Sequence, residues 1–197
     1  MIHPLFQRLT SFFLATFLTG AAFAAESLTL YDWQVHFQSN EQPPTTCFIQ
    51  LTGVNRKRLV LLDMNLSVVV EKVPLIGRKA TTILRIKAHR INKPDLSDLS
   101  PIQIHDAWIT TSLGTSAGKM KKIDVSPDPH YLGGKEGADL FHRLLEGILK
   151  DGAAIGYEEG PKGTETVSIV PVPPPDVIIN KLMPCLAAVL PDQDQPA

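Results

Sequence analysis

An alternation of apolar and polar residues with a period of two is the feature that most constrains the fold of this chain. It is clearest over residues 81–90, where Thr82, Leu84, Ile86 and Ala88 occupy one set of alternate positions. Successive side chains of a β-strand point to opposite faces of the sheet, so this segment is predicted to be a strand with one buried face. The same period predicts strands over residues 31–37 and 45–51.

Further segments complete the predicted elements. Two β-branched, apolar runs predict strands buried on both faces, at residues 59–62 and 66–70. Later strands are predicted at 102–111, 119–125, 153–157 and 165–170. From Asp139 the apolar residues recur at helical spacing until Gly152, a plausible stop signal. A last apolar helix is predicted after the proline-rich connector, with Asp176 as its cap and Pro184 kinking or shortening it.

The order of these elements defines the expected fold class. Many short strands separated by turns favour a mainly β domain, either a sandwich or a partly closed barrel. Two helices are expected near the C-terminus of that domain. The alternative is an α+β fold.

The N-terminal segment predicts export. A weakly basic start ending at Arg8 precedes an apolar stretch over residues 9–18 and the small-residue site Ala22-Phe23-Ala24. This is the pattern of a secretory signal peptide, cleaved after Ala24. The predicted organisation is therefore a signal peptide at 1–24, one β-rich domain at 25–190 and a flexible tail at 191–197, in a periplasmic or secreted protein. An uncleaved anchor is the alternative, although the apolar stretch is shorter than the roughly 20 residues of a spanning helix.

Two cysteines, Cys47 and Cys185, are the whole cysteine complement of the chain. In an oxidising compartment such a pair most simply forms one disulfide, which would tie an early strand to the final helix. The alternative is two buried free thiols.

Charge is distributed unevenly along the chain. Residues 56–122 hold 13 Lys and Arg against 5 Asp and Glu, whereas the chain as a whole has a net charge of −1. This asymmetry indicates either a basic face for an anionic partner or two halves that neutralise each other in the folded protein.

Arg85, Lys87 and His89 form the strongest candidate for a binding surface. They occupy alternate positions of the predicted strand 81–90, so their side chains would lie about 7 Å apart on one sheet face. Such a face suits a phosphorylated or acidic polymer, and basic residues at 56–58, 78–79 and 119–122 would extend it if the strands adjoin. The alternative is an exposed edge strand that is kept soluble by its charges.

Signatures of catalysis and of metal or nucleotide binding are weak. The glycine-rich segment 133–137 lacks the spacing of a phosphate-binding loop and is interpreted as a loop entering the helix. His142 and Glu146 share one helix face, which suits an ordinary ion pair as well as a metal. His105 and Asp106 are adjacent on a strand and are expected to face opposite ways. No catalytic residue, metal, cofactor or nucleotide is therefore predicted.

One local pattern resembles a known family. Asp32-Trp33-Gln34-Val35, followed by Cys47-Phe48-Ile49-Gln50, is similar to the opening of the invasion-associated locus B family of secreted bacterial proteins. That family usually carries a cysteine two positions after the valine, where this chain has Phe37. The resemblance implies a β-sandwich-like domain with a periplasmic or surface accessory role and without a known cofactor.

Three functional hypotheses follow. The leading one is a secreted, non-enzymatic accessory protein that binds an envelope component or a protein partner through Arg85 and Lys87. The second is a structural subunit of an envelope or secretion assembly. The third is a small periplasmic hydrolase that uses His105 or His142.

Overall fold

The computed structural model describes residues 26–28, 30–38, 45–73, 77–123, 130–160 and 163–189. The predicted signal peptide at 1–24 and the predicted tail at 191–197 lie outside these ranges. Within the described ranges, no helix is long and apolar enough to cross a membrane.

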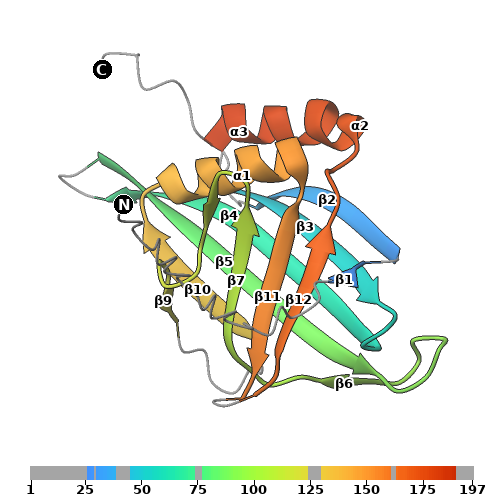
Figure 1. Ribbon diagram of the computed structural model, residues 1–197. Coiled ribbons are helices and arrows are strands. Elements are labelled where there is room, and N and C mark those ends of the chain that lie inside the picture. The colour runs from blue at the N-terminus through green and yellow to red at the C-terminus, as the bar shows by residue number, and fades with distance from the viewer. Residues whose placement is uncertain are drawn as a thin grey trace, which may run out of the picture.

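Two open sheets lie face to face, with helices along one end of the pair (Figure 1). The larger sheet has seven strands, ordered β2 (Leu30–Gln38), β3 (Thr46–Asn55), β4 (Val60–Val73), β5 (Gly77–Ile91), β10 (Tyr131–Glu136) and β9 (Lys121–Lys122), with β6 (Leu99–Pro101) paired to β5. The smaller sheet is ordered β1 (Glu26–Ser27), β12 (Glu165–Val170), β11 (Ala153–Glu159), β7 (Ile104–Thr111) and β8 (Gly114–Thr115). All pairings in these sheets are antiparallel except that of β1 with β12. The prediction of a mainly β, sandwich-like domain is confirmed.

The apolar core lies between the inner faces of the two sheets. The larger sheet contributes the buried alternate residues of its central strands, and the smaller sheet contributes those of β7 and β11: Ile49, Leu51, Leu62, Met64, Leu66, Leu84, Ile86, Ile109 and Ile155. The period of two that the sequence shows over residues 81–90 is therefore the burial pattern of β5.

Several predicted strand boundaries were wrong. The runs at 59–62 and 66–70 belong to the single strand β4, because Asp63 and Asn65 lie on its other face and do not interrupt pairing. The expected strand at 119–125 is reduced to β9 in the described residues. The glycine-rich segment read as a loop is largely strand β10, in which a Cβ at Gly133 would overlap the ring of Tyr131.

Helix α1 (Asp139–Asp151) covers the end of the sandwich with the face that carries Leu140, Phe141, Leu144 and Ile148. Its entry is fixed by Thr82, whose hydroxyl donates to the carbonyl of Gly137 at 2.8 Å and accepts from the Phe141 amide at 3.3 Å. The helix ends as predicted, at Gly152, which has a φ of 78° that favours glycine.

The second predicted helix is one helical segment made of α2 (Pro175–Val177), the π-helical turn η1 (Ile178–Leu182) and α3 (Met183–Val189). Asp176 is not its cap: Pro174 holds that position and Asp176 lies in the first turn. The segment continues past Pro184 to Val189, so the proline does not end it. The wider turn ends at Leu182, two residues before Pro184, which has no amide hydrogen to donate to the helix ladder.

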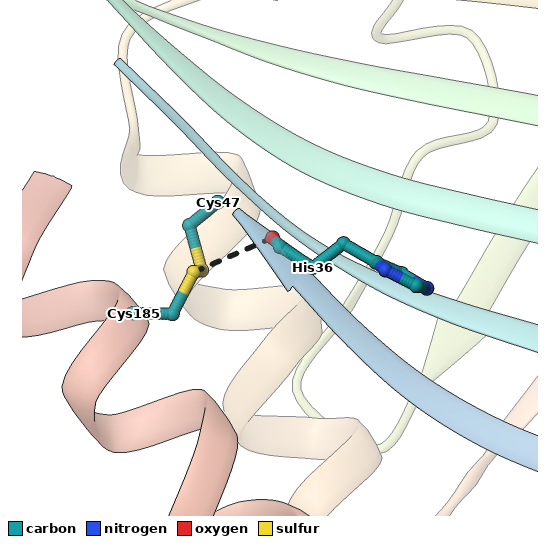
Figure 2. Close-up of a disulfide and its surroundings, with 3 residues drawn as sticks. All are labelled: His36, Cys47 and Cys185. Atoms are coloured by element: carbon teal, nitrogen blue, oxygen red, sulfur yellow. Dashed lines mark hydrogen bonds between the residues drawn. A yellow bond between two sulfur atoms is a disulfide. The ribbon is translucent and has the colours of Figure 1, made fainter. Parts of the chain in front are cut away.

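Cys47 and Cys185 form the predicted disulfide, which joins β3 to α3 (Figure 2). Their Cα atoms are 5.7 Å apart, and both residues are fully buried. Cys185 Sγ also lies 3.5 Å from the carbonyl oxygen of His36 on β2. At the last residue of α3, Arg78 of β5 donates to the carbonyl of Val189 at 3.3 Å. The final helix is thus attached to the large sheet by one covalent and one polar contact.

The disulfide is expected to contribute strongly to stability, because it closes a separation of 138 residues. Replacing both Cys47 and Cys185 by alanine should lower the free energy of unfolding by roughly 2–5 kcal/mol. Urea denaturation of the oxidised protein and of the variant measures this difference, and the reduced wild type should behave like the variant. Equal midpoints for all three samples would contradict the structural role of the bond.

Gly147 makes the close approach of α1 to β7 possible, since a Cβ there would overlap the Cβ of Thr111. Glycine to alanine inside a helix ordinarily stabilises by up to about 1 kcal/mol. Here Gly147→Ala should instead destabilise, by about 1–3 kcal/mol, because the helix must move off the strand. Thermal or urea unfolding gives the sign. The exposed neighbour Glu146→Ala is the control and should leave stability nearly unchanged.

Candidate functional site

The candidate site is the outer face of the seven-stranded sheet, the face turned away from the smaller sheet. Arg85, Lys87 and His89 lie on it as predicted, half-buried and alternating with the buried residues of β5. This strand lies between β4 and β10 in the sheet order, so it is not an edge strand. The edge-protection explanation of these charges is therefore wrong.

Strand register places polar residues beside the two cations. Arg85 is opposite Asn65 on β4, which is opposite Gln50 on β3, which is opposite Gln34 on β2. A row of three side-chain amides therefore runs across the sheet and ends at Arg85. Because neighbouring strands lie about 4.8 Å apart, the row is roughly 14 Å long.

A second row contains the acidic residues of this face. Lys87 is opposite Asp63, which is opposite Thr52 and then Asp32. The Asp63 carboxylate accepts from Gln50 Nε2, at 3.2 Å to Oδ1 and 3.1 Å to Oδ2. Asp63 is therefore held toward β3 by a hydrogen bond, on the side of β4 opposite to Lys87.

Aromatic and amide side chains complete the β2 side of the face. The ring of His36 stacks on Phe48, with centroids 4.9 Å apart. His36 Nε2 lies 3.0 Å from Gln34 Oε1, and Gln34 Nε2 donates to Asp32 at 2.7 Å. This chain of contacts fixes a hydrogen-bonding strip along β2.

The cations themselves are not neutralised. Within the part of the chain that the structure describes, Arg85 and Lys87 form neither an ion pair nor a hydrogen bond. His89, two positions further on, has a buried Nδ1 atom without a hydrogen-bond partner. The His89 Nδ1 atom is out of reach of a ligand on this face. Arg85 and Lys87 are half-buried, and an anionic ligand bound to them would offset the free-energy cost of their partial removal from water.

Other basic residues of the central segment are engaged elsewhere. Lys79 pairs with Glu136 at 2.6 Å, and Arg90 pairs with Glu159 at 2.9 Å. Lys122 donates to the carbonyl of His105. The ion pairs of Lys79 and Arg90 both join the basic segment 56–122 to the acidic remainder of the chain. Mutual neutralisation thus accounts for part of the charge asymmetry, and Arg85 and Lys87 are among the basic residues of the described segment that it leaves without an ion pair.

Of the basic residues that the sequence suggested as extensions of the patch, Lys121 lies on the same sheet face as Arg85, two strands away. Arg78 donates to the end of α3, and Arg56, Lys57 and Arg58 lie in the turn between β3 and β4 at the end of the sheet. Lys121, on the short strand β9, is opposite Gly134 of β10, which is opposite Ile83. The candidate site is therefore the local group around Arg85 and Lys87, rather than one continuous basic surface.

The residues considered for catalysis are placed apart. His105 and Asp106 are both exposed, because a bulge shifts the register of β7 against β11 at this point. His142 and Glu146 are exposed on α1. No group of three or more His, Cys, Asp or Glu among the described residues is arranged to hold a metal ion.

A tyrosine near β7 was not singled out by the sequence. Tyr131 of β10 is buried, and burial together with the Asp106 charge raises its pKa. Burial likewise raises the pKa of Tyr157 on β11. Only the pairing of β10 and β7 with their own sheets brings Tyr131 near Asp106, so no local sequence signal could have indicated it.

Comparison with protein-family models, with curated proteins and with solved structures finds no match to this chain.

Alkaline titration tests the buried tyrosines. In the folded protein, Tyr131 and Tyr157 should ionise above the ordinary value of 10.0. The unfolded chain loses these protons first, so stability should fall as the pH rises above about 10. Ultraviolet absorbance of phenolate follows ionisation, with Tyr131→Phe and Tyr157→Phe assigning each step. Ionisation of both tyrosines at the ordinary pKa would contradict their burial.

Proposed function

We propose that this protein is an exported, non-enzymatic accessory protein of the cell envelope that binds an anionic envelope polymer on the outer face of its larger sheet. The observation that carries the proposal is the pair Arg85 and Lys87, which lie together on β5 without a counter-ion among the described residues.

The chemistry of the surrounding face supports a polymer that carries both charges and hydroxyl groups. The amides of Gln34, Gln50 and Asn65 form a row that ends at Arg85. Amides donate and accept hydrogen bonds, which suits hydroxyls, and the two cations suit carboxylate, sulfate or phosphate groups. An extended sugar chain lying across the strands would meet the accessible amides of Gln34 and Gln50 and then Arg85, passing over Asn65, which is buried.

Two features support export. Residues 1–24 have the pattern of a secretory signal, and Cys47 and Cys185 form a disulfide, a bond that persists in oxidising compartments. The proposed periplasmic or secreted location gives the protein access to envelope polymers. It also agrees with the accessory role that the resemblance to the invasion-associated locus B family implies.

The non-enzymatic part of the proposal is supported by the placement of the histidines. His105 lies on β7, and His142 lies on the exposed side of α1. Neither is within hydrogen-bonding contact of a serine or cysteine nucleophile in the described part of the chain. The hydrolase hypothesis therefore gains no support from this geometry.

Charge removal on the outer face tests the proposal. Arg85→Ala combined with Lys87→Ala should weaken binding to two anionic polymers, dextran sulfate and the polysaccharide released from lipopolysaccharide by removal of its lipid, by about tenfold. This estimate takes roughly 1 kcal/mol or less of binding free energy for each surface charge removed. Binding by the wild type should also weaken with salt, since exposed charges are screened. Biolayer interferometry on immobilised protein measures both effects, with neutral dextran as the uncharged reference.

A matched control removes the same charge elsewhere. Arg56→Ala combined with Lys57→Ala takes two exposed cations from the β3–β4 turn and should leave polymer binding nearly unchanged. Equal affinity of the Arg85/Lys87 variant and the wild type, or binding that does not respond to salt, would show that this face is not the polymer site.

A further inference from the structure

Two leucines have unusual backbone conformations at the same end of the large sheet. Leu59 has a φ of 52° and Leu96 a φ of 61°, and these are the two non-glycine residues with positive φ among the described residues. This left-handed region is disfavoured for L-residues with a branched side chain, and glycine, asparagine and aspartate usually occupy it. Both leucines are also exposed, at 56% and 40%.

The two turns that carry them are neighbours. Leu59 closes the turn between β3 and β4, and Leu96 lies in the loop 92–98 between β5 and β6. The carbonyl of Leu59 accepts a hydrogen bond from the amide of Ile91, the last residue of β5 before that loop, at 2.7 Å. Both turns project from the end of the sandwich opposite the helices (Figure 1).

Hydrogen bonds hold both turns in shape. In the first turn the side chain of Asn55 accepts from the amide of Arg58 at 3.1 Å and donates to Ser168 of the smaller sheet at 3.3 Å. In the second, Asn92 donates through its side chain to Asp98 at 3.1 Å and to Ser100 at 2.7 Å. The outward position of the leucines is therefore built into the backbone.

The two turns together carry more basic than acidic residues. Arg56, Lys57 and Arg58 occupy the first turn and Lys93 the second, against two acidic residues, Asp95 and Asp98. Both acidic side chains accept hydrogen bonds within their own loop. Leu59 follows three basic residues, Leu96 lies in a loop of net charge −1, and the two turns together hold four basic and two acidic residues. Exposed leucines in a region of net positive charge match a membrane surface that offers acyl chains below anionic headgroups.

We propose that these two turns are a docking site for an anionic lipid membrane, with Leu59 and Leu96 inserting at the interface. Insertion removes two apolar side chains from water, and this gain favours membrane binding. The site is separate from the polymer face, and the proposal does not rest on the proposed function.

The test uses asparagine, which tolerates positive φ but does not insert into lipid. Leu59→Asn combined with Leu96→Asn should keep or raise the stability of the fold, because asparagine suits the left-handed conformation. The same variant should lose about tenfold in vesicle binding per leucine. The oxidised full-length domain is assayed by co-sedimentation with vesicles of phosphatidylcholine and phosphatidylglycerol, and with vesicles of phosphatidylcholine alone.

Two controls separate this site from the rest of the surface. Leu113→Asn removes another exposed leucine, which is 37% exposed. The next residue, Gly114, lies against Arg143 of α1, away from the two turns, so this variant should leave vesicle binding unchanged. Arg85→Ala with Lys87→Ala should also leave it unchanged, so failure of the polymer proposal is distinguishable from failure of this one.

The outcomes are decisive in both directions. Membrane docking is supported if the asparagine variant is at least as stable as the wild type but binds vesicles more weakly. It is also supported if the wild type binds more weakly to vesicles without phosphatidylglycerol. Absence of vesicle binding by the wild type would overturn the proposal and leave a protein surface as the occupant of these turns. Unchanged binding by the asparagine variant would overturn it as well, since the contact would then involve other residues.

Discussion

The structure depends on covering the inner face of a sheet that is wider than its partner. Strands β2 to β5 and β10 present a continuous apolar surface, whereas the smaller sheet has three strands longer than two residues. Helix α1 and the final helical segment cover the remaining area, and burial of that area is the main favourable term in folding. The disulfide from Cys47 to Cys185 fixes the final helix there, at a site where both residues are fully buried.

This arrangement leaves the outer face of the large sheet open to a partner. Cross-strand register, rather than proximity in sequence, gathers Gln34, Gln50, Asn65 and Arg85 into one row. The same strand that presents Arg85 and Lys87 ends beside the turn of Leu59. Ile91 is four positions after Lys87, or roughly 13 Å along a strand, so a polymer on the face and a membrane at the turns could be held at the same time.

The sequence was sufficient where the signal was local. The alternation over 81–90 predicted both the buried face of β5 and the side on which Arg85, Lys87 and His89 lie. The two cysteines predicted their own pairing, since no competing partner exists in the chain.

Features that depend on distant contacts were not predictable. Gly133 resembles a loop residue, yet it lies in β10 because the ring of Tyr131 fills the space of its missing side chain. The bulge that exposes both His105 and Asp106 is set by pairing with β11. Arg85 lacks an ion pair because register places the neutral Asn65 opposite it. Lys87 is opposite Asp63 but forms no ion pair with it, because the Asp63 carboxylate is hydrogen-bonded to Gln50 on the other side. Local sequence contains neither contact.

The central claim is that the outer face around Arg85 and Lys87 is a polymer-binding surface. The most direct measurement is a two-dimensional amide NMR titration of the isotope-labelled protein with dextran sulfate oligosaccharides. The account predicts chemical-shift changes concentrated in residues 85–89 of β5 and at their cross-strand neighbours Asn65 and Gln50, reduced by added salt. Shifts confined to the turns at 56–59 and 92–98, or an unchanged spectrum at saturating polymer, would contradict it.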